Sequence, residues 1–122
     1  MEQKTQIQKE EPRGCEASEL GSLVTPHFNQ LTPAEAERLA LLAEECGEVI
    51  QVVGKILRHG YESRHPNGGP TNRKLLEREI GDVFAAVDML CSPLHEDLNG
   101  DVLMDWRYKK HHSVKQYLHH AG

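Results

Sequence analysis

Five acidic side chains stand in two short groups, each embedded among apolar residues. The first group is Glu44, Glu45 and Glu48, and the second is Glu79 and Asp82. If these carboxylates lie close together they repel one another, and burying them is costly unless a cation neutralises them. A hard divalent cation such as Mg²⁺ prefers oxygen ligands and keeps positions open for water and phosphate. The residue types therefore predict a metal-binding, phosphate-handling site.

The spacing within each group suits convergence on one ion. Residues three or four apart on a helix project side by side, as Glu45 and Glu48 would, and as Glu79 and Asp82 would. Glu44 is close enough to join them or to hold a water. An E-E-x-x-E run alone is usually a solvated helix face. The flanking Leu, Val, Ile and Gly residues and the presence of two such groups favour a shared site.

Three helices are expected to position these groups. Thr32 and Pro33 suit a helix start, with Glu35 completing a capping box, and Gly60 suits the end. A loop rich in Gly, Pro and Asn then leads to a second helix, capped by Thr71 or Asn72 and ended before Pro93, and this short loop makes the two helices antiparallel neighbours. The predicted helices cover residues 33 to about 58, 72 to about 91, and 101–120.

Apolar residues recur at about 100° per residue along one side of the first predicted helix, as expected for packing. They are Leu39, Leu42, Cys46, Val49, Ile50, Val53, Ile56 and Leu57. The sequence has no strand pattern, so it predicts an all-α fold, an antiparallel helical bundle. Because one three-helix protomer does not easily cover both faces of its first helix, we expect a homodimer or homotetramer.

Length and composition limit the classes of protein to which this sequence can belong. The 122 residues allow one domain, expected at 31–122 after a flexible N-terminal arm at 1–30. A net charge of −5 argues against a nucleic-acid polymer as partner. Three cysteines without a CxxC pair disfavour zinc ligation and a disulfide framework. No apolar run reaches the roughly 20 residues of a membrane span, and the polar N-terminus does not suit a secretory signal. We therefore expect a cytoplasmic protein with no membrane partner.

The paired acidic motif resembles that of a known family. The segment Leu42-Ala43-Glu44-Glu45-Cys46-Gly47-Glu48, followed by Glu79-Ile80-Gly81-Asp82, is similar to the EExxE…ExxD signature of the MazG-like nucleoside triphosphate pyrophosphohydrolases, members of the all-α NTP pyrophosphatase superfamily. The similarity covers roughly residues 31–118. It implies hydrolysis of a nucleoside or deoxynucleoside triphosphate between its α and β phosphates, which yields the monophosphate and pyrophosphate.

The resemblance also implies roles for particular residues. The metal ligands, for Mg²⁺ or alternatively Mn²⁺, would be Glu45, Glu48, Glu79 and Asp82. Glu44 is a candidate to orient or deprotonate the attacking water. Lys110 on the last helix is the candidate phosphate contact, with Arg107 and Lys109 as alternatives, and His59, Asn72 and the loop are near enough to contribute to base contacts. Lys55 is a further substrate-binding candidate from its position alone: two turns beyond Glu48 on the same helix face, it could touch a phosphate or pair with a carboxylate, and the plainer interpretation is a surface lysine.

A second hypothesis belongs to another class of protein. In a non-catalytic helical interaction protein, the same carboxylates would serve ion pairs with Lys55, Arg73, Lys74 or Arg78. The two hypotheses differ on metal dependence and on whether removing a carboxylate costs activity or stability.

Overall fold

The computed structural model describes residues 28–120 of the chain. The chain divides into two compact units, Met1–Pro33 and Ala34–Gly122. The predicted flexible arm at 1–30 lies almost entirely outside the described residues. The helices α2 to α4 belong to the second unit, apart from the first residue of α2, and the account below concerns that unit.

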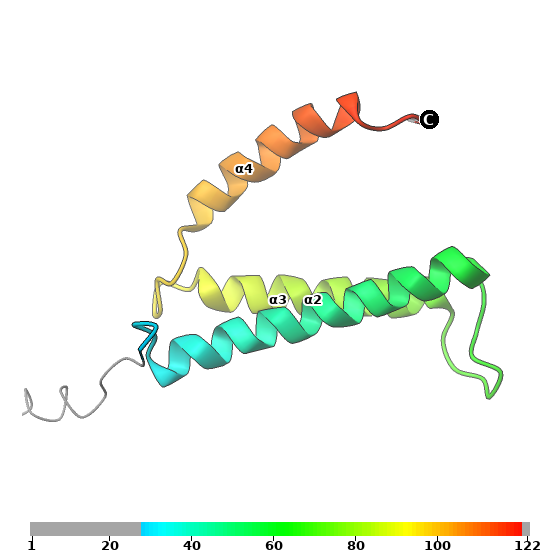
Figure 1. The fold of residues 1–122 in the computed structure, drawn as a ribbon, viewed down its shortest axis with the longest axis horizontal. Coiled ribbons are helices and arrows are strands. Elements are labelled where there is room, and N and C mark those ends of the chain that lie inside the picture. Colours follow the sequence, from blue (N-terminus) through cyan, green and yellow to red (C-terminus); the bar gives the residue numbers. More distant parts are fainter. Residues whose placement is uncertain (1–27, 121–122) are drawn as a thin grey trace, which may run out of the picture. The chain divides into compact units, whose positions relative to one another are not determined.

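The described part of the chain is helical, as predicted (Figure 1). Helix α2 spans Pro33–His59, α3 spans Asn72–Leu90 and α4 spans Gly100–Ser113, followed by a short 3₁₀ helix, η1, at Val114–Gln116. Residues 28–120 contain no strand, only an isolated bridge between Arg64 and Thr71. The all-α prediction is therefore confirmed. Within the same range, no helix is long and apolar enough to cross a bilayer.

Local chemistry explains the ends of the first two helices. Proline suits the first turn of α2 because its fixed φ is already helical and its missing N–H would have had no partner there. Gly60 follows α2 with a φ of 89°, and its N–H donates to the Ile56 carbonyl at 2.7 Å. The Thr71 hydroxyl accepts a hydrogen bond from the Lys74 N–H at 3.3 Å and so caps α3. These boundaries lie within about a residue of the predicted ones.

Helix α4 is shorter than the sequence predicted. The expected helix over 101–120 ends at Ser113 and continues only as the turn η1. The Ser113 hydroxyl donates to the Lys110 carbonyl at 3.4 Å, and such bonds compete with the helical ladder. No residue of α4 is buried. Because most helical stability in proteins comes from packing, the residues after Ser113 have nothing to hold them in an α-helix. The prediction for this end was wrong for that reason.

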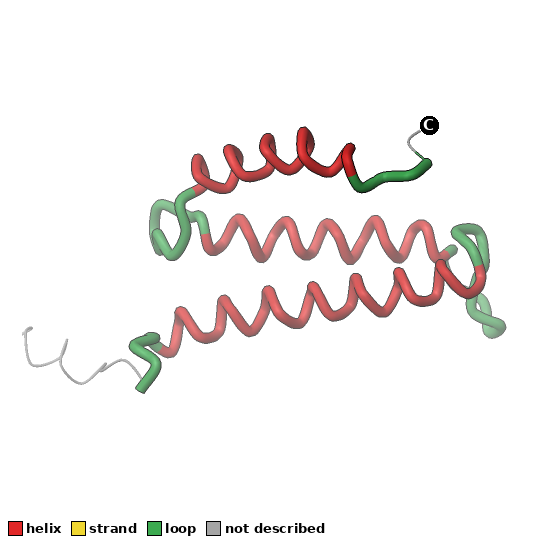
Figure 2. Tube along the Cα trace, turned by 45° about the horizontal axis from the view of Figure 1, so that its top comes forward, coloured by secondary structure: helices red, strands yellow, loops and turns green. Residues whose placement is uncertain are grey.

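Helices α2 and α3 run antiparallel, side by side, in both views of the chain (Figure 2). A paired charge ties the beginning of α2 to the linker that follows α3. The Arg38 guanidinium donates to both carboxylate oxygens of Asp97, at 2.5 and 3.0 Å, and these side chains are only 16% and 12% exposed. The hydrogen bond from Arg38 holds the pKa of Asp97 below its usual value. This contact and the loop 60–71 fix the two ends of the helix pair.

The hydrophobic core of a single chain is thin. Among the described residues, the buried hydrophobic side chains are Val52, Ala86 and Leu90. Much of the apolar face predicted for α2 is uncovered: Ile50 is 71% exposed and Leu57 is 82% exposed. The helices therefore form as the sequence predicts, while a large apolar surface remains open to a further packing partner.

Candidate metal centre

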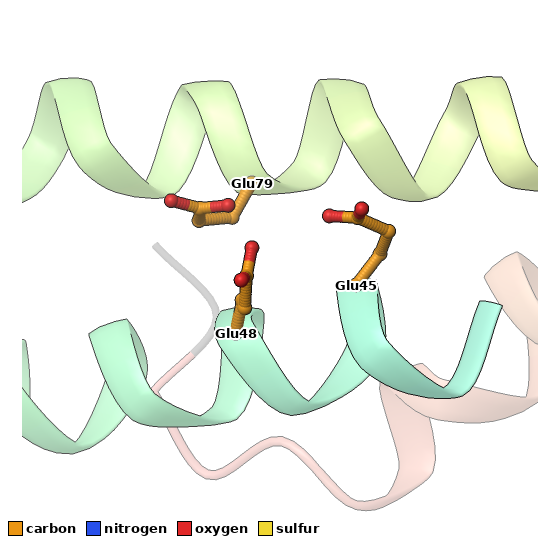
Figure 3. Close-up of side chains that lie close together, drawn as sticks. All are labelled: Glu45, Glu48 and Glu79. Atoms are coloured by element: carbon orange, nitrogen blue, oxygen red, sulfur yellow. The ribbon is translucent and has the colours of Figure 1, made fainter. Parts of the chain in front are cut away.

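The structure brings together three of the five acidic residues singled out above. Glu45 and Glu48 project from α2 toward Glu79 on α3 (Figure 3). One carboxylate oxygen from each residue lies within 4.8 Å of the others. The i, i+3 spacing on α2 places two carboxylates on the side of that helix that faces α3, and the antiparallel pairing supplies the third. The arrangement is a cluster of oxygen donors between two helices.

The buried member of the cluster is Glu79, at 6% relative exposure. Its Oε1 accepts two hydrogen bonds from the Arg78 guanidinium, at 2.8 and 3.3 Å. This hydrogen bonding by Arg78 lowers the pKa of Glu79 despite burial, and the nearby charge of Lys55 acts in the same direction. Glu79 is therefore held in the ionised form that a metal ion requires.

The other two carboxylates are shifted in the opposite direction. A hydrogen bond with Glu79 and the charge of Glu79 raise the pKa of Glu48 above its usual value. Burial raises the pKa of Glu45, and the charges of Asp82, Glu44 and Glu79 add to that effect. Mutual repulsion of this kind is relieved when a cation binds, because the cation stabilises every ionised carboxylate at once.

An unpartnered oxygen gives a direct indication that a cation fits here. Within the described part of the chain, Oε2 of Glu45 is buried and accepts no hydrogen bond. Buried polar atoms are nearly always paired, so such an atom calls for an explanation. A hard divalent cation, with its preference for carboxylate oxygens, is the partner whose chemistry fits this donor set.

The remaining predicted site residues of the acidic motif lie around this cluster. Glu44 and Asp82 are both exposed, and neither belongs to the three converging carboxylates. Their charges nevertheless act on Glu45, which places them in the same electrostatic environment. Glu44 is the neighbour of Glu45 on α2, and Asp82 follows Glu79 by one turn of α3.

Two of the three predicted substrate-binding residues line one cavity. Lys55 and Asn72 contribute to a cavity of about 340 Å³ at the end of the helix pair where α2 leads into the loop. The Asn72 side chain also supports the loop, because its Nδ2 donates to the Gly60 carbonyl at 3.1 Å. Lys110 lies on α4, exposed, and is not among the residues that line this cavity.

Sequence reasoning missed two cationic residues of this cavity, Arg58 and Arg64. A signal existed for Arg58, because it follows Lys55 by three residues and so projects from the same side of α2. Arg64 carried no such signal, since its position depends on how the loop folds. Arg78 was expected only as an ion-pair partner, and the structure places it directly on a carboxylate of the candidate centre.

Fold and site together define a class: an all-α protein with a carboxylate centre between two antiparallel helices. The family model of the MazG nucleotide pyrophosphohydrolase domain matches residues 34–106, more than half of the chain, and the chain belongs to this family. The matched region includes every acidic residue of the centre. Comparisons with curated proteins and with solved structures found no match. Family membership supports a nucleotide pyrophosphohydrolase activity in general, and enzymes of the family generally use divalent metals.

Proposed function

We propose that this chain hydrolyses a nucleoside or deoxynucleoside triphosphate to the monophosphate and pyrophosphate in a reaction that depends on Mg²⁺ or, alternatively, Mn²⁺. The ligands would be Glu45, Glu48, Glu79 and Asp82. The observation that carries the proposal is the convergence of three carboxylates from α2 and α3, with one buried oxygen of Glu45 left without a partner. Family membership supplies the reaction class.

The proposed roles of the metal and of the surrounding residues follow from the charges of the site. When bound, the metal ion would supply a positive charge for the phosphoryl oxygens and would make a bound water more acidic. Glu44, exposed beside Glu45, is the residue that we propose orients the attacking water or accepts its proton. Lys55, Asn72 and Lys110 are the proposed contacts to the substrate. A lysine near the departing pyrophosphate stabilises the negative charge that develops there.

The alternative, a helical interaction protein with its carboxylates in ion pairs, has one observation in its favour. Arg78 does pair with Glu79. Within residues 28–120, however, neither Glu45 nor Glu48 forms an ion pair, and both have raised pKa values. Carboxylates kept for structural ion pairs would have lowered pKa values and cationic partners. The alternative therefore accounts for Glu79 alone.

A direct assay tests the proposal. The purified full-length chain is incubated with Mg²⁺ and each common NTP and dNTP in turn, and pyrophosphate and monophosphate are measured. We expect equal amounts of both products from at least one substrate, and no release when a chelator removes the metal. Release of inorganic phosphate in place of pyrophosphate, or no turnover of any nucleotide, would contradict the proposal.

Metal binding should weaken as the pH falls. Protons compete with a cation for carboxylates, and the raised pKa values of Glu45 and Glu48 bring that competition to a higher pH than for ordinary glutamates. Calorimetric titration with Mn²⁺ at a series of pH values below about 7 should therefore show affinity falling at a higher pH than in a site of glutamates with the ordinary pKa of about 4.3. An affinity independent of pH over this range would place the ion elsewhere.

The same groups predict how stability depends on pH without metal. A carboxyl whose pKa is raised by folding binds more protons in the native state, so its contribution favours folding at low pH and is lost as the pH rises from its ordinary pKa through the raised one. Added divalent metal should remove this loss. Thermal unfolding with and without Mg²⁺ at several pH values measures both effects.

We also propose that the active form is a homodimer or homotetramer. The exposed apolar side chains of α2 and the thin core of the single chain support this assembly. A second copy of the chain is a partner whose own exposed helix faces have the same apolar character.

A further inference from the structure

We propose that the cavity between the end of α2 and the loop 60–71 is a polyphosphate-binding site, which receives the terminal phosphates of the nucleotide substrate. The inference rests on the proposed function for its choice of substrate. It assigns to substrate binding two residues, Arg58 and Arg64, that neither the acidic motif nor the family match points to.

The lining of the cavity has one sign of charge. It includes Lys55, Arg58 and Arg64, together with the titratable His59 and His65, and it includes no carboxylate. This is unusual for a chain with a net charge of −5. A concave surface lined by one sign of charge attracts ligands of the opposite sign. The lining therefore selects an anion.

The cationic groups of the cavity are available to a ligand. Elsewhere in residues 28–120, Arg38, Arg73, Arg78 and Lys109 form ion pairs with carboxylates. Within the same residues, Lys55, Arg58 and Arg64 form none. Arg64 uses one nitrogen, Nη1, to donate to the Gly69 carbonyl at 2.9 Å, which positions its guanidinium and leaves other N–H groups for an anion.

The cavity is shaped by a loop with many internal bonds. The Asn72 N–H donates to the Ser63 carbonyl and the Arg73 N–H to the Tyr61 carbonyl, both at 2.9 Å. The Arg73 side chain adds an ion pair with Glu62 at 2.7 Å and lies over the ring of Tyr61. These contacts hold the loop against the start of α3 before any ligand arrives. Binding to a preformed cavity loses less entropy than binding that must order a loop.

Size and position indicate a polyphosphate that belongs to the substrate. The volume of about 340 Å³ is roughly ten times the ~30 Å³ share of one water, so the cavity has room for more than one phosphate group. Lys55 lies seven residues beyond Glu48 on the same side of α2, about 10 Å along the helix axis. Its charge also reaches Glu79. A nucleotide with its α-phosphate at the carboxylate centre can therefore extend its terminal phosphates toward Lys55 and the cavity.

Inorganic tripolyphosphate is a suitable probe, because it carries the anionic chemistry without a base or sugar. We expect it to bind the full-length chain in metal-free buffer, measured by calorimetry, and to shift the amide signals of loop 60–71. Arg58→Gln and Arg64→Gln should each weaken binding about tenfold or more, since each removes a charge-assisted contact. Lys74→Gln is the matched control, because Lys74 is an exposed cation in the first turn of α3, near the same loop, that forms no ion pair within residues 28–120 and does not line the cavity.

In the binding experiment, no binding of tripolyphosphate, or an equal loss of affinity in the Lys74→Gln control, would overturn the inference. Circular dichroism verifies that both arginine variants fold. If Arg64→Gln does not fold, Arg58→Gln decides the question, because it leaves the loop contact of Arg64 in place. In the hydrolysis assay, Arg58→Gln should raise KM more than it lowers kcat, and tripolyphosphate should compete with the nucleotide. Non-competitive inhibition would show a separate anion site and overturn the assignment to substrate.

The outcomes separate this inference from the proposed function. Pyrophosphate release by a chain that does not bind tripolyphosphate at the cavity would overturn the inference alone. Cavity binding of tripolyphosphate by a chain that hydrolyses no nucleotide would overturn the proposed function and the identity of the ligand as its substrate, and it would leave the cavity as a polyphosphate-binding site.

Discussion

Glu48→Gln is expected to lower pyrophosphate release by at least about 100-fold while the folded chain stays as stable as before or becomes more stable. Loss of even a supporting residue around a metal commonly costs 10–100-fold in activity or affinity, and Glu48 is proposed as a direct ligand. The amide keeps the size of the side chain and removes one negative charge from a cluster with raised pKa values. Steady-state kinetics with saturating Mg²⁺ and thermal unfolding without metal measure the two effects.

The opposite signs of these effects make the variant informative. Glu77→Gln is a matched control, because Glu77 is an exposed glutamate of α3 outside the three converging carboxylates, and it should change neither quantity appreciably. If Glu48→Gln lowered stability and left nucleotide hydrolysis unchanged, the carboxylate would have a structural role. The hypothesis of a non-catalytic interaction protein would then be the better one.

Local sequence chemistry was sufficient for the two helices that carry the acidic centre. Pro33, Gly60 and the Thr71 cap act through neighbouring backbone groups, so their effect can be predicted from the residues themselves. The i, i+3 placement of Glu45 and Glu48 is likewise a property of one helix. For these reasons the two predicted helices and the convergence of Glu45 and Glu48 with Glu79 correspond to those in the structure, whereas Asp82 lies outside the three converging carboxylates.

Features that depend on tertiary contacts could not be predicted in the same way. The end of α4 at Ser113 reflects a lack of buried packing, which helical periodicity does not report. Periodicity also identified the apolar face of α2 without showing how much of it a single chain would cover. Arg64 reaches its cavity only because the loop 60–71 folds back on the start of α3. Arg78 contacts its sequence neighbour Glu79, although adjacent residues on a helix diverge by about 100°.

Ile50→Glu is expected to shift the chain from an oligomer to a monomer. Ile50 lies in the middle of α2, on the apolar face predicted from the sequence, and is 71% exposed in the single chain. Burial of an isoleucine contributes about 1.5–3 kcal/mol, and a charge placed in a dry interface adds a larger penalty. A combined loss of about 4 kcal/mol corresponds to roughly 1,000-fold weaker association. Sedimentation velocity over a range of protein concentrations measures the change.

The exposure of Ile50 makes this prediction specific to assembly. In a monomer, a mostly exposed isoleucine contributes little to the core, so glutamate at this position should leave helix content nearly unchanged by circular dichroism. Leu94→Glu is the matched control, since Leu94 is 88% exposed but lies in the linker after α3 and not on the helix face. It should leave the oligomer intact. A wild-type chain that sediments as a monomer at every concentration would contradict the proposed assembly, because the apolar face of α2 would then tolerate water without a partner.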